Sequence, residues 1–182
     1  MDYCIKVNKR LNTYGYGVPV DEKLIELEGP AFANAYRTMS VSEFEKYKGG
    51  VCWDYNMYQY IHLRSHGIRS YNFYIELHDP MSSTHTFTVV PTHNCYIYIE
   101  SSYLKIQGVY VSGSLDAIIS FVLSHMNPDH KAYAVRGYKI PTSGKTTLQF
   151  MDWCFWNGKE VKFDYVKTRT IGRGDYKEIV EV

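Results

Sequence analysis

The chain has 182 residues, of which 45% are hydrophobic and 21% are charged. This composition excludes intrinsic disorder and coiled coil, and the length fits one domain, over residues 1–182, with a hydrophobic core of its own. Twenty basic and nineteen acidic residues leave a net charge of +1, and no basic block stands out, so we expect no nucleic-acid partner.

The predicted elements start with a strand over residues 1–13 and helical pieces over 21–48, where Ser40 and Glu43 fit a capping box. A longer helix fits residues 52–66, and Gly67 is suited to end it. From residue 68 the hydrophobic period changes to two, which predicts four consecutive strands. Their expected bounds are 68–77, 85–90, 95–101 and 106–111.

Residues 114–127 form the clearest helix, with Ser114 as its cap and an apolar stripe along one face. We then expect a strand at 132–140, a short aromatic helix or turn at 147–156 and a strand at 160–167. Helices first and an antiparallel sheet afterwards indicate the α+β class.

The four cysteines lie at positions 4, 52, 95 and 154, and none forms a CxxC pair. This spacing argues against a zinc site and predicts reduced thiols in a cytoplasmic compartment. No apolar run approaches the roughly 18 residues of a membrane helix, and the first residues lack a secretory signal. We therefore expect a cytoplasmic protein without a membrane partner; its oligomeric state stays open.

Cys52 follows Gly49-Gly50-Val51 and opens the helix predicted at 52–66. The unpaired backbone N–H groups of a helix N-terminus favour a thiolate and can also receive an oxyanion. A nucleophilic thiol needs a base, and the base needs a group that orients it. We expect His85 to be the base, because it opens the strand at 85–90.

Glu100 is the candidate for the orienting group. If the strands at 85–90 and 95–101 form a hairpin in which paired residue numbers sum to 185, His85 lies directly opposite Glu100. Phe87 then pairs with Tyr98. A shift of two residues places Ser102 opposite His85 instead.

The order Cys52, His85, Glu100 resembles the transglutaminase-like branch of the papain-like cysteine peptidases. The resemblance rests on Gly-Gly-Val-Cys52-Trp-Asp, Thr-His85-Thr-Phe-Thr-Val and Tyr-Ile-Glu100-Ser-Ser, and covers roughly residues 40–111. It implies a Cys-bearing helix packed on an antiparallel sheet. The family usually has Asp as its third member, where this chain has Glu100.

The resemblance implies acyl transfer through a thioester on a protein or peptide substrate, without cofactor or metal. Hydrolysis by a peptidase or deamidase is the first expectation, and amine transfer or a non-catalytic binding module are the alternatives. We expect Trp53, His78 and Asp79 to contribute to substrate binding. If the site has an oxyanion hole, the Cys52 N–H is one donor, and no second donor is identified.

Two other patterns are better explained by structure. His62 and His66 are spaced for metal binding on one helix, but the HExxH pattern is absent. The segment ending in Gly144-Lys145-Thr146 lacks the upstream glycine of a phosphate loop and fits a turn followed by a helix cap.

Overall fold

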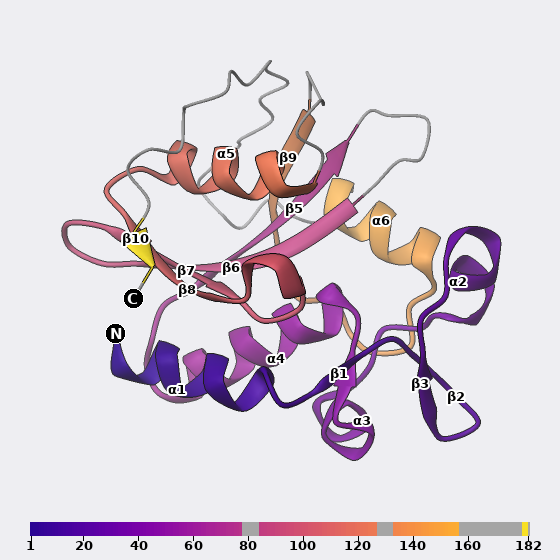
Figure 1. Cartoon of the computed structure of the whole chain (residues 1–182). Coiled ribbons are helices and arrows are strands. Elements are labelled where there is room, and N and C mark those ends of the chain that lie inside the picture. Colours follow the sequence, from indigo (N-terminus) through magenta and orange to yellow (C-terminus); the bar gives the residue numbers. More distant parts are fainter. Residues whose placement is uncertain (78–83, 127–132, 157–179, 182) are drawn as a thin grey trace.

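An antiparallel sheet forms the centre of the fold (Figure 1). The computed structural model describes residues 1–77, 84–126, 133–156 and 180–181. The strand order is β10-β8-β7-β6-β5-β9, with the short β10 at one edge. The strands are β5 (Tyr71–Leu77), β6 (Thr84–Pro91), β7 (Tyr96–Glu100), β8 (Gly108–Ser112), β9 (Tyr133–Tyr138) and β10 (Val180–Glu181).

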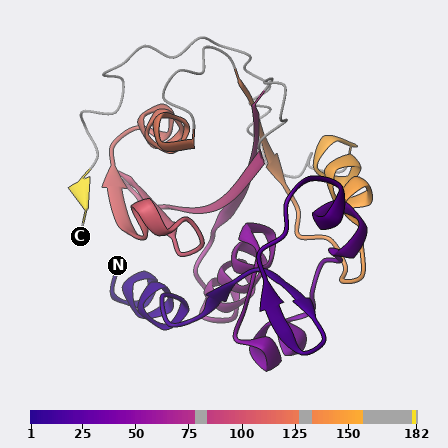
Figure 2. The same cartoon turned by 45° about the vertical axis from the view of Figure 1, so that its right-hand side comes forward.

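Helices cover both faces of the sheet, which confirms the α+β class. Figure 2 shows α5 (Leu115–Met126) inside the curve of the sheet, and α1 (Asp2–Leu11) and α4 (Cys52–Ser65) against the opposite face. Side chains of β7 alternate accordingly: Tyr98 belongs to the same core cluster as Ile118 of α5, while Ile97 and Ile99 belong to a separate cluster that contains Leu63 of α4. The expected packing of the Cys-bearing helix on the sheet is therefore present.

Most of the elements predicted after residue 51 are confirmed within one to three residues. Gly67 ends α4 with a φ of 72°, and the Ser114 Oγ accepts the Ala117 N–H at the start of α5. Residues 147–156 form the helix α6 (Thr147–Trp156), and the strand predicted at 160–167 lies outside the described residues. No helix in the described part of the chain is long and apolar enough to cross a membrane.

The strand predicted at residues 1–13 is wrong, because this segment forms helix α1. Cys4, Val7 and Leu11 are buried on one side of the helix, at the spacing of a helical face. Asp2 in the first turn and Arg10 in the last turn suit the helix dipole. In this short segment the hydrophobic residues follow the helical spacing more closely than the alternation of a strand, which is why the strand prediction failed.

Residues 14–50 combine short strands with short helices. Helices α2 (Gly29–Ala35) and α3 (Val41–Tyr47) confirm the helical pieces, and Ser40 and Glu43 form the predicted capping box. A hairpin of β2 (Val18–Val20) and β3 (Lys23–Ile25) occupies the part expected to be helical around residue 23. Strand β1 (Gly15–Tyr16) pairs in parallel with β4 (Gly49–Gly50), directly before α4.

The β1–β4 pairing requires glycine at position 49. Its φ is 155°, and a Cβ atom there would lie 2.0 Å from the Gly15 carbonyl oxygen. We predict that Gly49→Ala lowers the free energy of unfolding by about 2–4 kcal/mol, since strain and a backbone clash add. Urea unfolding measures this, with Gly113→Ala as control, because Gly113 has open space around its Cα. Equal stability of the two variants would contradict the pairing.

Candidate active site

The first turn of α4 is fixed from inside the protein by the buried Asp54. Asp54 Oδ2 accepts the Val51 N–H at 3.0 Å, and Oδ1 accepts the Met39 N–H at 3.0 Å and the Tyr36 hydroxyl at 2.8 Å. Burial raises the pKa of Asp54 to about 6, although its hydrogen bonds favour the carboxylate. These bonds hold Cys52 in place as the first residue of the helix.

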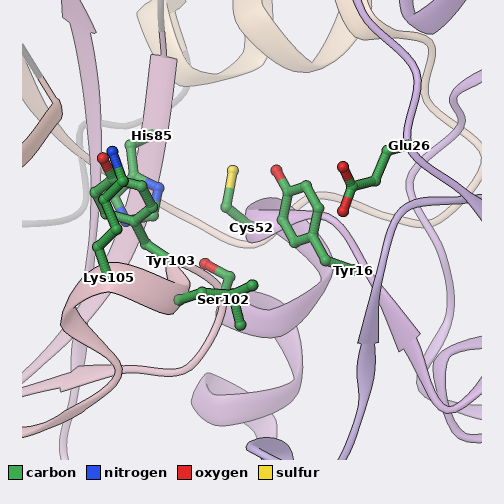
Figure 3. A pocket seen from close by; sticks show the side chains of 8 residues that line it. Tyr16, Glu26, Cys52, His85, Ser102, Tyr103 and Lys105 are labelled. Carbon is green, nitrogen blue, oxygen red and sulfur yellow. The ribbon is translucent and has the colours of Figure 1, made fainter.

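Tyr16 reaches Cys52 because β1 pairs with β4. Tyr16 lies opposite Gly50, and the Gly17 N–H donates to the Gly50 carbonyl at 3.0 Å. Hydrogen bonding links the backbone N–H of Cys52 to the phenol oxygen of Tyr16, and Figure 3 shows this oxygen beside the Cys52 side chain. Burial of the hydroxyl, followed by the charges of Cys52 and Glu100, raises the pKa of Tyr16. Tyr16 could not be predicted from the sequence, since no local pattern indicates a parallel pairing between strands more than thirty residues apart.

The first-choice register for β6 and β7 is wrong, and the alternative shifted by two residues, with Ser102 at the position opposite His85, is the one that the strands adopt. Val89 pairs with Tyr98, so paired numbers sum to 187 rather than 185. The Thr92 N–H donates to the Cys95 carbonyl at 2.8 Å, and the Thr92 Oγ1 accepts the Cys95 N–H at 3.0 Å. This closes the hairpin over His93-Asn94, a two-residue loop in which Asn is well suited.

His85 and Glu100 nevertheless meet. The last β6–β7 pair is Thr88 with Ile99, so His85 lies beyond the paired region and Glu100 is its diagonal neighbour. Diagonal neighbours on one face are farther apart than direct pairs, but long side chains bridge them. The His85 Nε2 contacts the Glu100 Oε2 at 2.7 Å. The glutamate side chain is long enough to bridge this diagonal.

Glu100 is 2% exposed and saturated with hydrogen bonds. Its Oε2 accepts the Tyr98 hydroxyl at 2.6 Å in addition to the His85 ring. Its Oε1 accepts the Ser102 N–H at 2.8 Å, the Ser102 hydroxyl at 2.9 Å and the Tyr103 N–H at 3.0 Å. Glu100 is therefore a buried, fully hydrogen-bonded carboxylate and not a surface charge at the end of a strand.

The two buried groups stabilise each other's charged forms. Burial by itself lowers the pKa of His85, but the Glu100 carboxylate and hydrogen bonding to Cys52 raise it to about 10. Burial by itself raises the pKa of Glu100, and the charge of His85 with the surrounding hydrogen bonds brings it below its usual range. Because Nε2 contacts Glu100, Nδ1 is the ring nitrogen that remains for hydrogen bonding to Cys52.

The end of β7 is also held from behind, by helices α1 and α4. Asn8 Nδ2 donates to the Glu100 carbonyl at 2.6 Å and to Ser101 Oγ at 3.0 Å. Gln59 Nε2, on α4, donates to the same Ser101 Oγ at 2.9 Å. Both amides are buried, so the N-terminal helix and the Cys-bearing helix position the backbone of Glu100.

Cys52 opens into a cleft of about 390 Å³ (Figure 3). Its sulfur lies between the His85 ring and the Tyr16 hydroxyl. One wall carries Glu26 beside Tyr16, and the opposite wall carries Tyr103 and the residues around it. The remaining lining residues are Ser102, Leu104 and Lys105.

A second hollow of about 230 Å³ shares Tyr16, Cys52, His85 and Tyr103 with the first. Its further lining residues are Thr84 and Met126. Two hollows therefore adjoin the thiol. A molecule that extends beyond the bond that reacts with Cys52 would need such additional space.

Trp53 is not among the residues that line either hollow. It is 4% exposed, and its ring stacks on Phe150 with centroids 3.9 Å apart, so it belongs to the core. His78 and Asp79 lie outside the described residues. His62 and His66 stack on Tyr58 and Tyr3, and no group of three His, Cys, Asp or Glu side chains in the described ranges is placed to hold a metal ion.

Comparison with protein-family models, with curated proteins and with solved structures finds no match to this chain.

We predict that Cys52 is alkylated first when iodoacetamide is limiting at pH 6. Burial raises the pKa of Cys4 and of Cys154, each 1% exposed, whereas Cys52 faces a cationic His85 and a cleft. Peptide mapping identifies the labelled thiol. Cys52→Ser should remove the fast reaction and Cys95→Ser should keep it; a fast reaction that survives in Cys52→Ser would contradict the assignment.

We predict that Glu100→Gln lowers the free energy of unfolding by about 3 kcal/mol, since one partner of a buried charge pair is lost. Any activity that depends on Cys52 should follow the order parent, Glu100→Asp, Glu100→Gln, because aspartate keeps the charge but has a shorter reach. Urea unfolding and turnover measure the two effects. The control is Glu28→Gln at an exposed position, and parent-like turnover in Glu100→Gln would refute the orienting role.

The His85–Glu100 pair predicts a definite pH dependence of stability. The pKa of His85 is about 6.5 in the unfolded chain and about 10 in the folded protein. Its contribution to the free energy of unfolding is therefore complete below about pH 6.5 and is lost as the pH rises through about 10. Glu100 contributes above its unfolded pKa of about 4.3 and loses this as pH falls further. The stability advantage of the parent over His85→Gln should therefore shrink from pH 6.5 to 10, by at most about 1.4 kcal/mol per pH unit. Urea unfolding across this range checks it, and a constant difference would contradict it.

Proposed function

We propose that this chain is a cysteine-dependent acyl transferase that hydrolyses peptide or carboxamide bonds, with the architecture of the transglutaminase-like branch of the papain-like enzymes. One observation carries the proposal. A buried carboxylate holds one nitrogen of His85 at 2.7 Å, and the other nitrogen serves a cysteine at a helix start inside an open cleft. This is the arrangement that nucleophilic thiol catalysis requires.

In the first half of the proposed reaction, the Cys52 thiolate attacks the carbonyl carbon of the substrate and forms a tetrahedral oxyanion. His85 then donates its Nδ1 proton to the departing amine as the C–N bond breaks. The acyl group remains on sulfur as a thioester. Glu100 stays deprotonated throughout the reaction, and its negative charge stabilises the positive charge of the imidazolium.

Acylation itself prepares His85 for the second half. The charge of Cys52 is one of the contributions that raise the pKa of His85, and it disappears when the sulfur becomes a thioester. The pKa of His85 falls in the acyl-enzyme, so the neutral ring can take a proton from water. The resulting hydroxide attacks the thioester, the C–S bond breaks, and the thiolate and the imidazolium are restored.

Tyr16 is placed to assist the oxyanion. Its hydroxyl oxygen is hydrogen-bonded by the Cys52 backbone N–H, and an oxyanion bound by that N–H forms at the same place. In the proposed reaction the substrate carbonyl oxygen enters between the two groups. The Tyr16 hydroxyl turns from acceptor to donor, which supplies the second donor of the oxyanion hole.

The open cleft favours hydrolysis over amine transfer. Both reactions share the thioester and differ in the acceptor, and an open site admits water to it. A non-catalytic module has no need for a cationic His85 beside a thiol that opens into a cleft. These features support the enzyme over the binding module.

The proposed function is tested by incubating the parent and Cys52→Ala with a mixed peptide library rich in glutamine. Three products are measured by mass spectrometry: new peptide termini, glutamate formed from glutamine, and peptides coupled to an added fluorescent primary amine. We expect new termini or glutamate with the parent alone. Coupled amine as the main product would establish amine transfer, and identical product profiles from both proteins would reject the proposal.

We predict that Tyr16→Phe lowers kcat for that reaction about 10- to 1000-fold with little change in KM, since an oxyanion donor acts mainly in the transition state. Stability should change little, because Tyr16 as a whole is 40% exposed and does not belong to the core. Steady-state kinetics measures the split between kcat and KM. Tyr14→Phe is the control, since Tyr14 bonds to Glu45 away from the cleft; an unchanged kcat in Tyr16→Phe would remove Tyr16 from the mechanism.

A further inference from the structure

A second, polar pocket of about 180 Å³ lies at the far end of α4. It is formed where α4 ends, β5 begins and β9 ends, and it shares no lining residue with the Cys52 cleft. Arg64 lies twelve residues after Cys52, which separates the two sites by about 18 Å along the helix axis. The pocket therefore belongs to a different part of the molecule from the proposed active site.

Three basic side chains line this pocket: Arg64, Arg69 and Lys139. The Arg64 guanidinium lies 5.9 Å from the ring centre of Tyr60, and the Arg69 guanidinium lies 5.0 Å from that of Tyr71. Stacking on aromatic faces orients a guanidinium while its N–H donors stay available. None of the described residues that line the pocket is acidic, and neither arginine has a carboxylate partner among the described residues.

Two buried polar atoms of the pocket also lack partners. Ser70 is 5% exposed and Asn72 is 2% exposed, and both line the pocket. The Ser70 Oγ and the Asn72 Oδ1 have no hydrogen-bond partner within the described structure. A buried polar atom without a hydrogen-bond partner destabilises the folded protein, so a ligand that forms hydrogen bonds with both atoms would gain binding free energy.

We propose that this pocket binds a phosphoryl group. Two guanidinium groups without carboxylate partners in the described part of the chain suit a dianion better than a single carboxylate, and their geometry matches that of phosphate oxygens. The Ser70 hydroxyl donates a hydrogen bond to a phosphate oxygen. The Asn72 Oδ1 accepts a bond from an adjacent guanidinium or from the hydroxyl of a singly protonated phosphate.

The pocket is also connected to the helix that carries Cys52. Tyr138 lines it, and the Tyr138 hydroxyl donates to Asn56 Oδ1, one turn after Cys52 in α4. Asn56 in turn donates to Thr88 Oγ1 of β6 at 2.5 Å. The inference concerns binding alone, and it stands whether or not the Cys52 cleft is catalytic.

The test is an NMR titration of the full chain with sodium phosphate at constant ionic strength. We expect saturable shifts of the backbone amides of residues 69–72, with acetate at least tenfold weaker than phosphate. Arg64→Gln combined with Arg69→Gln should weaken phosphate at least tenfold, and Ser70→Ala about fivefold. A parallel titration with phenyl phosphate identifies the source: tighter binding than inorganic phosphate assigns a phosphate ester, and weaker binding assigns the free ion.

The matched control is Lys6→Gln combined with Lys23→Gln, which removes two positive charges at exposed positions outside the pocket. This variant should bind phosphate as the parent does. If the control and the arginine variant lost the same affinity for phosphate, the loss would reflect the net charge of the protein rather than the pocket, and the proposal would be overturned. Acetate binding as tight as phosphate, or shifts that do not saturate, would overturn it as well.

Discussion

The contact between His85 and Glu100 is the interaction on which the rest of the site depends. A charged pair at 2.7 Å with both side chains almost fully buried is stable only if the remaining oxygen lone pairs are satisfied. The Ser102 and Tyr103 backbone amides and the Tyr98 hydroxyl do this, so the chain directly after β7 must turn back onto its own carboxylate. The turn in the backbone that completes the pair also forms one wall of the cleft.

Both walls of the cleft depend on contacts between segments that lie far apart in the sequence. Asn8 of α1 holds the Glu100 carbonyl, and Gly49 allows the backbone of β1 to pass close enough to bring Tyr16 to Cys52. The N-terminal helix and the first strand thus position the two sides of one thiol. A protein that only needed a stable core has no requirement for this convergence, which supports a reaction at Cys52.

Local patterns were sufficient to predict the helix at Cys52, the strands that follow and the α+β class, because each depends on period, caps and turns within about ten residues. The same patterns assigned the segment at Val7 to a strand, since a short amphipathic helix and a strand differ by few residues. The Glu100 contact was predicted from a direct pairing but is made across a diagonal, because Thr92 and Cys95 close the hairpin at another place. The position of Tyr16 beside Cys52 could be predicted only from the β1–β4 pairing, and no local sequence pattern indicates that pairing.

The central claim is that His85 is a cation that keeps Cys52 reactive. The most direct measurement is the rate of Cys52 alkylation between pH 5 and 10, in the parent and in His85→Ala, with Cys95→Ser in both to remove the half-buried thiol that could compete. The account predicts that Cys52 reacts at least tenfold faster in the parent than in the variant in the acidic part of this range, because an imidazolium beside the thiol favours the thiolate. Superimposable profiles in the two proteins would contradict it.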